Sequence, residues 1–501
     1  MFVSNGGGGG DAGFGNGGLD GSREQLRRVF FGNVGSPKTA EAVETVPTGV
    51  NRAKKTGGVH LCLAQPHELP RDAGPETIPV FGIDTALCPD EALAGDRWTV
   101  WALRLARAGR AGVFSNHAAD AVRALMGPDF AVSVLRPALV CPAAPRPSSR
   151  AILRLRGSVL DTAKWADTRP IDAPPAAPTV TDDLFEGSDP SDLASEPVPA
   201  WRKTPRYRLG TVRKHATLVY REALRDLLPL PLARLVSQTA GAGHRSARRI
   251  LAAIVQAKNA GPTGLAQAPG WQVGDVDVPV GGGVVVVFAA VLGALDQGWE
   301  DLLSAFVATC KGDGQATLVI KTGELDADTG VGYADFVRRL GPFTCRIVIL
   351  AGDIEGGLDQ LIGASDFYAC ASHGEAAPLP LMRFLAAGRP AVSPSHSALA
   401  DFVDPASSFV VESSIEYAAY PGDVEQRLRA TRWRPDWESL CRGLADARAL
   451  RGSPTAYQAR ASATAAGMAR LCDPDVVQTA LATLVAQPSR QGAQPAALVA
   501  A

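Results

Sequence analysis

Residues 365–392 read SDFYACASHGEAAPLPLMRFLAAGRPAV, and they carry the pattern that decides the fold. Residues 366–370 form a short β-type run, and Ser372–Glu375 is a polar turn in which a glycine lets a ligand approach the backbone closely. Pro380 suits the first turn of a helix, which a glycine and a proline then end. A carboxylate in such a loop, between two strands, lies where an α/β sheet binds a phosphorylated ligand.

Composition narrows the class of protein. A chain of 501 residues is too long for one ordinary core, so we expect two or more domains. The net charge of −1 argues against a whole-chain nucleic-acid binder. The eight cysteines form no CxxC pair, which favours buried free thiols over a disulfide framework or a metal site. The N-terminus does not read as a secretory signal, and no apolar run approaches the ~20 residues of a membrane span. We therefore expect a cytoplasmic protein.

Strands alternate with helices in two blocks, residues 58–142 and residues 271–440. In the first block, strands are predicted at 59–63, 78–83, 111–115 and 131–135, and helices at 96–108 and 117–126, the latter capped by Asn116. In the second block, strands are predicted at 284–288, 316–320, 346–350 and 366–370, with helices between them. This alternation predicts two Rossmann-like domains with parallel sheets.

The remaining segments lie outside these blocks. Residues 1–57 are Gly-rich; GFGNGG at 13–18 formally matches GxGxxG, but without a clean strand–turn–helix unit a flexible tail is the preferred interpretation. Residues 143–200 are predicted to form an acidic Pro/Ala-rich linker. Residues 201–270 are predicted to be a basic helical insertion, of which 201–258 would either bind an anionic membrane surface or present a solvated face. Residues 441–501 are predicted to be helices ending in a tail.

The segment 372–390 resembles a known signature. Its residues stand in register with Ser-x-x-Glu-Gly-x-x-Leu-Pro-x-x-Glu-Ala-x-x-x-Gly-x-Pro, the donor-site pattern of retaining nucleotide-sugar glycosyltransferases of the GT-B fold. The matching residues are Ser372, Glu375, Leu379, Pro380, Gly388 and Pro390. The stretches HSALADFVDP (396–405) and WESL (437–440) are similar to a bacterial polysaccharide-type branch of glycosyltransferase family 4. The resemblance implies two Rossmann-like domains with a central cleft.

The resemblance also implies roles for residues. Glu375 would be the catalytic residue against the donor sugar, and the matching residues Ser372, Leu379 and Pro380 would bind the donor. We add His373 and Gly374 as donor-binding residues because they lie in the same loop, Arg383 because it lies near the N-terminus of the predicted helix, and Lys321 because it directly follows the predicted strand 316–320. The resemblance implies no metal and no cofactor, because the nucleotide-diphosphate sugar is itself a substrate. The partners would be that donor and a glycan or lipid-linked acceptor, with no nucleic acid. If 201–258 binds lipid, the protein would lie at the inner face of the membrane.

Two departures from the signature favour an alternative function. A second glutamate that accepts hydrogen bonds from ribose hydroxyls is replaced by Arg383, and arginine can only donate them. The stretch 289–299 also lacks the Arg and Lys that neutralise a pyrophosphate in the family. Arg383 would restore some of that charge, and Lys321 could contact a phosphate. The alternative is a catalytically impaired pseudo-glycosyltransferase that acts as a scaffold in polysaccharide assembly.

Histidines of the first block are further candidates for contact with the sugar. His60, His67 and His117 are available, and His117 follows a predicted strand at a turn. A lone histidine is more often structural than functional, so the structural interpretation is preferred for all three.

Overall fold

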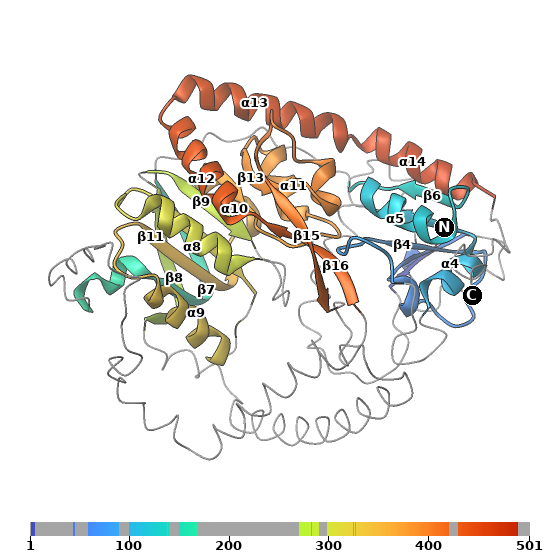
Figure 1. Ribbon diagram of the computed structural model, residues 1–501, viewed down its shortest axis with the longest axis horizontal. Helices are drawn as coiled ribbons and strands as arrows, with labels where there is room; N and C mark the ends of the chain where they lie inside the picture. The colour runs from blue at the N-terminus through green and yellow to red at the C-terminus, as the bar shows by residue number, and fades with distance from the viewer. Residues whose placement is uncertain are drawn as a thin grey trace, which may run out of the picture. The chain divides into compact units, whose positions relative to one another are not determined.

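The computed structural model describes residues 2–5, 44–45, 59–89, 100–137, 139, 150–168, 270–281, 283–289, 298–323, 325, 327–419 and 429–488. The chain divides into two compact units, residues 1–165 with 262–501 and residues 166–261. The second unit lies almost wholly outside the described residues. The described residues of the first unit form three sheets, one of six strands, one of eight strands and a two-stranded hairpin (Figure 1).

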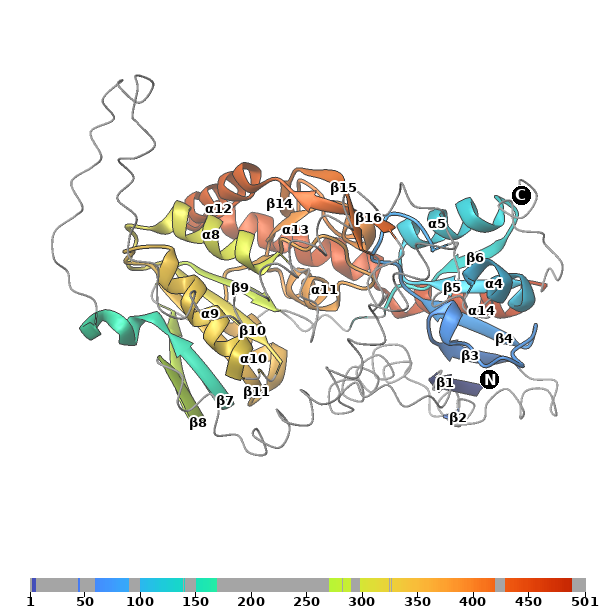
Figure 2. The same cartoon turned by 60° about the horizontal axis from the view of Figure 1, so that its bottom comes forward.

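The first sheet has six strands, and every neighbouring pair in it is parallel. In spatial order its strands are β2 (Glu44–Thr45), β1 (Phe2–Asn5), β3 (His60–Leu63), β4 (Thr77–Phe81), β5 (Arg110–Val113) and β6 (Ala131–Val134). Two helices, α4 (Trp101–Ala108) and α5 (Asn116–Met126), bury their apolar faces against it. We call these strands and helices the first lobe (Figure 2).

Short local signals set the helix boundaries of the first lobe. Helix α5 begins after Ser115, whose hydroxyl accepts a hydrogen bond from the Ala118 amide at 3.1 Å. The sequence prediction that Asn116 caps this helix was therefore wrong by one residue. The Ser115 hydroxyl accepts from the Ala118 amide, which has no backbone partner within the helix. Asn116 is already the first residue of the helix.

The second sheet has eight strands. In spatial order they are β14 (Ser408–Val411), β13 (Ala391–Pro394), β12 (Phe367–Ala369), β9 (Val285–Ala289), β10 (Thr317–Thr322), β11 (Arg346–Ile354), β7 (Arg150–Asp161) and β8 (Trp271–Gly281). The first six are parallel, and β7 and β8 are antiparallel. Read from β11 to β14, the parallel strands follow the doubly wound order, so the strand order reverses between β9 and β12.

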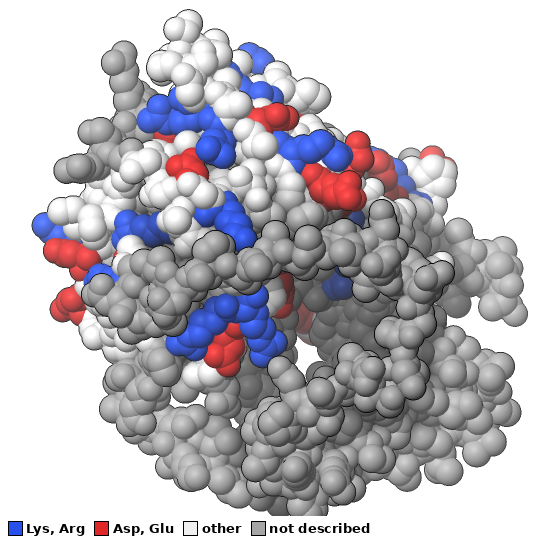
Figure 3. Space-filling model, turned by 60° about the vertical axis from the view of Figure 1, so that its left-hand side comes forward, with Lys and Arg blue, Asp and Glu red and all other residues white. Residues whose placement is uncertain are grey.

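Helices cover both faces of this sheet, so its parallel strands are apolar on both sides. Three helices pack on one face: α8 (Trp299–Cys310), α9 (Ala327–Arg339) and α12 (Trp437–Arg451). Two helices pack on the other face: α10 (Gly357–Ala364) and α11 (Leu379–Ala386). Helix α13 (Pro454–Leu471) contributes side chains to both cores. A hairpin of β15 (Ser413–Ala419) and β16 (Arg429–Pro435) completes the second lobe. Figure 3 shows basic and acidic side chains intermixed on one face of the molecule.

The last of the described helices, α14 (Pro474–Ala486), returns to the first lobe. Its Leu484 is buried in a cluster with Leu61, Ile78 and Val80 of the first sheet. The guanidinium of Arg110 donates to the carbonyl of Val485 at 2.8 Å. The predicted C-terminal helices are thus present, and they join the two lobes.

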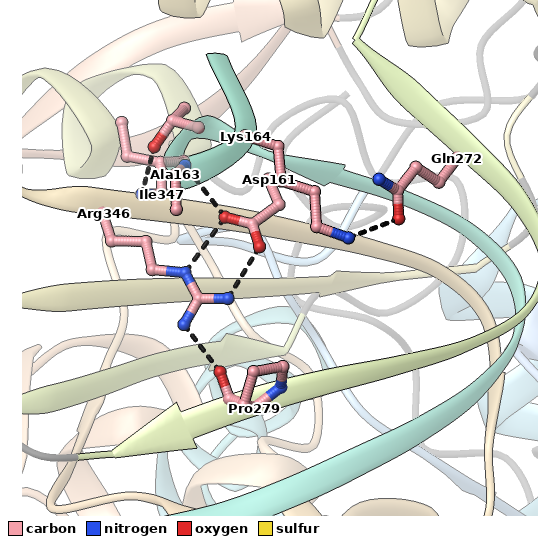
Figure 4. Close-up of polar contacts among 8 residues, drawn as sticks. Asp161, Ala163, Lys164, Gln272, Pro279, Arg346 and Ile347 are labelled. Carbon is pink, nitrogen blue, oxygen red and sulfur yellow. Dashed lines mark hydrogen bonds and ion pairs between the residues drawn. The ribbon is translucent and has the colours of Figure 1, made fainter. Parts of the chain in front are cut away.

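Part of the predicted linker 143–200 is instead a strand of the second sheet. In β7, Leu153 and Leu155 are buried while Arg154 and Arg156 face solvent, and the strand pairs with both β11 and β8. The Asp161 carboxylate accepts from the Arg346 guanidinium at 2.6 and 3.0 Å (Figure 4). The same guanidinium donates to the Pro279 carbonyl of β8 at 2.6 Å. The strand is followed by a 3₁₀ helix, Thr162–Thr168.

The chain leaves and re-enters the second sheet at neighbouring points. A Cβ atom added to Gly270 would lie 2.5 Å from the indole nitrogen of Trp165, and Gly270 has a left-handed φ of 93°. The chain from β7 to β8 thus starts and ends at one place.

The first domain also begins earlier than the predicted boundary at residue 58. Strand β1 pairs in parallel with β3 over four residues, and β2 flanks it. Residues 2–4 could be read as a stub of strand, but these strands are very short and the Gly-rich stretch after β1 carries no helical periodicity, which is why the boundary was placed too late. The GFGNGG match at 13–18, the basic segment 201–258 and residues 290–297 lie outside the described residues. Within the described parts of the chain, no helix is both long and apolar enough to cross a bilayer.

Candidate functional site

The predicted loop lies at the point where the strand order of the second sheet reverses. The 372–378 loop follows β12, and β12 pairs with β9 on one side. Gly298, the N-cap of α8, has a left-handed φ of 63°, and an added Cβ atom there would lie 2.0 Å from the Ala371 carbonyl oxygen. The N-terminus of α8, where backbone amides and the helix dipole favour an anion, therefore lies against the start of the loop.

Hydrogen bonds fix the backbone of this loop. The Ser372 hydroxyl donates to the Gly374 carbonyl at 3.0 Å. The Glu375 amide donates to the Ser397 hydroxyl at 3.0 Å, and the Glu375 carbonyl accepts from the Ala398 amide at 3.1 Å. Both backbone groups of Glu375 are thus held by the same short segment after β13.

The environment of Glu375 disfavours its charged form. Burial raises the pKa of this carboxyl to about 7, the Asp84 carboxylate adds to the rise, and a hydrogen bond from Ser372 opposes it. Near neutral pH both protonation states of Glu375 are populated. A carboxyl with such a pKa in a loop at the carboxyl end of a parallel sheet is a candidate for chemistry.

The first lobe packs directly on this loop. An added Cβ atom on Gly374 would lie 1.8 Å from the Asp84 carbonyl oxygen, and one on Gly82 would lie 2.5 Å from the Ala376 carbonyl oxygen. The two glycines therefore allow the segment after β4 to approach the 372–378 loop backbone to backbone. This close approach explains the glycine that the sequence places next to the candidate glutamate.

Strand β16 binds to both segments. The Ala86 amide donates to the Thr431 carbonyl at 2.7 Å, and the Trp433 amide donates to the His373 carbonyl at 3.0 Å. The Trp433 ring stacks on His396 at 4.9 Å between ring centroids and meets the edge of His117 at 5.1 Å. Trp433, His396 and His117 thus border the loop, and no pattern in the sequence had connected them.

The histidines differ in their surroundings. His117 contacts the Thr85 carbonyl through Nε2 at 2.8 Å. Burial lowers the pKa of His396 to about 4, with smaller contributions from His373 and His117, so His396 is neutral at neutral pH. His60 contacts the Thr77 hydroxyl at 3.3 Å. His67 accepts from the Trp101 indole at 3.1 Å, and both contacts lie within the first lobe.

A buried ion pair joins the lobes beside the loop. Asp401, whose side chain is 4% exposed, accepts from the Arg136 guanidinium at 2.9 and 3.2 Å. The same carboxylate accepts from the Asn116 amide, in the first turn of α5, at 3.1 Å. Neither charged residue was predicted as a site residue, although Asp401 lies within HSALADFVDP (396–405), because the two lie far apart in the chain and only the packing of the lobes brings them together.

The other predicted site residues have varied positions. Leu379 and Pro380 form the first turn of α11. Arg383 makes an ion pair with Asp359 of α10 at 2.5 Å. Lys321 lies within β10, not after it, and donates to the Thr322 carbonyl; burial lowers its pKa, and Asp353 partly opposes this. Both cations are thus engaged within the second lobe. Among the described residues, no group of three His, Cys, Asp or Glu could hold a metal ion.

The described sheets confirm an α/β fold with two Rossmann-like parallel-sheet domains. No family model and no curated protein matches the chain. It is similar to the structure of HepE from Anabaena in complex with UDP, at 11% identity over 96% of this chain and 98% of that one, with a TM-score of 0.47. The structure of HepE with UDP-glucose is similar at 12% identity over 97% of this chain and 99% of that one, with a TM-score of 0.45.

A third similar structure is the pneumococcal O-GlcNAc transferase GtfA in complex with UDP and GlcNAc. The identity is 15%, the TM-score is 0.30, and the match covers 40% of this chain. This chain matches 36% of the GtfA chain.

Proposed function

We propose that this protein is a glycosyltransferase that transfers a sugar from a nucleotide-diphosphate donor to a glycan or lipid-linked acceptor, with retention at the anomeric carbon. The observation that carries the proposal is the position of Glu375. It lies in a loop at the reversal point of a doubly wound sheet, where such folds bind nucleotides, and that loop begins against the N-terminus of α8. The UDP and UDP-glucose bound in similar structures support a nucleotide sugar as the donor.

The site offers two groups for such a transfer. The bond between the anomeric carbon and the diphosphate breaks. The oxygen of the acceptor hydroxyl bonds to the anomeric carbon on the face that the diphosphate leaves, and the proton of that hydroxyl passes to the leaving phosphate. The amides at the N-terminus of α8 would stabilise the charge that develops on the diphosphate. Ionised Glu375 would stabilise the positive charge on the sugar ring. The proposal assigns Ser372, His373, Gly374, Leu379 and Pro380 to the donor pocket.

A specific observation supports a second candidate, the pseudo-enzyme that acts as a scaffold in polysaccharide assembly. Arg383 stands where the resembling family has a carboxylate, and its guanidinium is already paired with Asp359. If Arg383 nevertheless supplies charge to a phosphate, Arg383→Glu should lower nucleotide affinity. Unchanged affinity would show that Arg383 does not compensate for the missing basic pair.

Calorimetry with a panel of nucleotides and nucleotide sugars tests the first proposal. We expect the wild type to bind at least one nucleotide sugar more tightly than millimolar, and Glu375→Ala to weaken that binding. Millimolar or weaker binding of every compound would refute the glycosyltransferase proposal. Binding without turnover of the bound donor would favour the scaffold.

The location of the protein in the cell is part of the proposal. We place the protein in the cytoplasm, with the basic segment 201–258 at the inner face of the membrane. Sedimentation with liposomes, with and without anionic lipid, tests this contact. Equal sedimentation with both kinds of liposome would exclude an electrostatic interaction with the membrane.

A further inference from the structure

One short element contacts both the candidate glutamate and the first lobe. The 3₁₀ helix η9 spans Ser397–Asp401 and follows β13. Its first residues bind the backbone of Glu375, and its last residue binds the first lobe. Only three residues separate Ser397 from Asp401, so the position of one end of η9 constrains the position of the other.

The Glu375 end of η9 is held in a costly conformation. Ser397 has a φ of 47°, and it is the non-glycine residue with a left-handed φ among the described residues. Such a conformation costs of order 1 kcal/mol and persists where surrounding contacts determine it. Those contacts are the Glu375 amide on its hydroxyl at 3.0 Å and His396 Nδ1 at 3.3 Å.

The Asp401 end meets a preformed site for an anion on the first lobe. Arg136 follows β6 and offers two guanidinium donors, and the Asn116 amide at the start of α5 offers a third. Helix dipole and arginine both favour the carboxylate. The three donors come from two different parts of the first lobe, so they fix the position of Asp401 relative to that lobe.

We propose that η9 is a positioning element through which the docking of the first lobe on Asp401 sets the backbone of Glu375. Asp401 and Ser397 are positioning residues in this scheme, because they act on the donor site through Glu375. The proposal rests on the proposed function in one respect only, the chemical role of Glu375. The mechanical link itself depends on the contacts described above.

The link has a consequence for the ionisation of Glu375. The polar and titratable groups around it are the Ser372 hydroxyl, the Asp84 carboxylate and the neighbouring ring of His373, with His396 and His117 next to Trp433. If η9 moves away, the Glu375 backbone moves with it, the carboxyl becomes more exposed to water, and its pKa falls from about 7 toward its ordinary value of 4.5. Activity that requires ionised Glu375 would then increase with pH, and it would reach half its maximum at a lower pH.

The chain offers a matched control for a test. Asp161 and Arg346 form an ion pair within the second lobe, with side chains 5% and 19% exposed. For Asp401 and Arg136 the values are 4% and 22%. Asp401→Asn and Asp161→Asn therefore remove the same charge from equally buried pairs.

Two measurements on the full chain decide the proposal. In Asp401→Asn we expect amide hydrogen exchange of residues 372–378 to become about 10-fold faster, since about one hydrogen bond's worth of protection is lost. We also expect the pH midpoint of kcat/KM to fall from about 7. Asp161→Asn should change neither quantity. Ser397→Ala should reproduce the exchange result without affecting the Asp401–Arg136 pair.

The outcomes separate the two proposals. Unchanged exchange at 372–378 in Asp401→Asn would overturn the positioning role, and so would an equal acceleration in Asp161→Asn. If the wild type turns over no nucleotide sugar, the proposed function fails. The exchange measurement still decides whether η9 positions Glu375, because it needs no substrate.

Discussion

Two of the ion pairs with a buried carboxylate, Asp161–Arg346 and Asp401–Arg136, have the same chemistry and different surroundings. Asp161–Arg346 joins neighbouring strands of one sheet, and Arg346 also binds the Pro279 carbonyl of the next strand (Figure 4). Asp401–Arg136 joins an element of the second lobe to the first lobe. The first pair cannot separate unless strands separate. The second can separate by a movement of η9 alone, so burial by itself does not define what an ion pair does.

This difference predicts different costs for breaking each pair. Removal of one partner from a buried pair is expensive when the other charge stays buried. The cost is smaller when the remaining charge can reach water.

Asp161→Ala should lower the free energy of unfolding by about 3–5 kcal/mol, because Arg346 stays buried between strands without its partner. Urea denaturation measures the change. Asp275→Ala, at the exposed pair of Arg156 and Asp275, is the control and should cost at most about 1 kcal/mol. Equal losses in the two variants would show that the sheet tolerates an unpaired Arg346.

Asp401→Ala should lower the free energy of unfolding by about 2 kcal/mol, less than Asp161→Ala, because Arg136 becomes hydrated once η9 moves away. The same urea experiment compares them directly. A loss as large as that of Asp161→Ala would mean that the second pair is as rigidly enclosed as the first.

Glu375→Gln should remove a pH dependence of stability. The pKa of Glu375 is raised in the folded state, so its contribution to stability is fully present below about pH 4.5 and is lost as the pH rises through about 7. We expect the difference between wild type and Glu375→Gln to change by about 1 kcal/mol between pH 5 and pH 8, since the side chain is only partly buried. A constant difference would mean that the carboxyl is well hydrated.

Ser397→Gly should change the free energy of unfolding by about 0.5 kcal/mol or less. The glycine relieves the left-handed φ of 47°, and this gain offsets the lost hydrogen bond to Glu375. Thermal melting measures the net effect. A large loss would show that the hydroxyl contributes more than one ordinary hydrogen bond.

Much of the second lobe could be predicted because its signals are local. The 365–392 stretch contains its strand, loop and helix within one short segment, and apolar runs mark the buried parallel strands. Strand β7 was missed because one of its faces is exposed and carries alternating arginines, and because a Pro-rich stretch lies next to it. Local pattern was not sufficient there, since pairing with β11 decides the structure.

The candidate site was predicted in part for the same reason. Ser372, His373, Gly374 and Glu375 are consecutive, so one motif locates them. Arg136, Asp401 and Trp433 come from three distant segments, and only the packing of the lobes brings them to the loop. The sequence also placed Lys321 after its strand, because it could not show that pairing with β11 continues to Thr322.

The contact between Trp165 and Gly270 has a consequence for how this chain can be altered. To the second sheet, the whole stretch that joins β7 to β8 is equivalent to a hairpin connection, since it starts and ends at one point. Its length and composition can therefore change without shifting the register of any strand. That junction is the natural position for grafting a foreign domain.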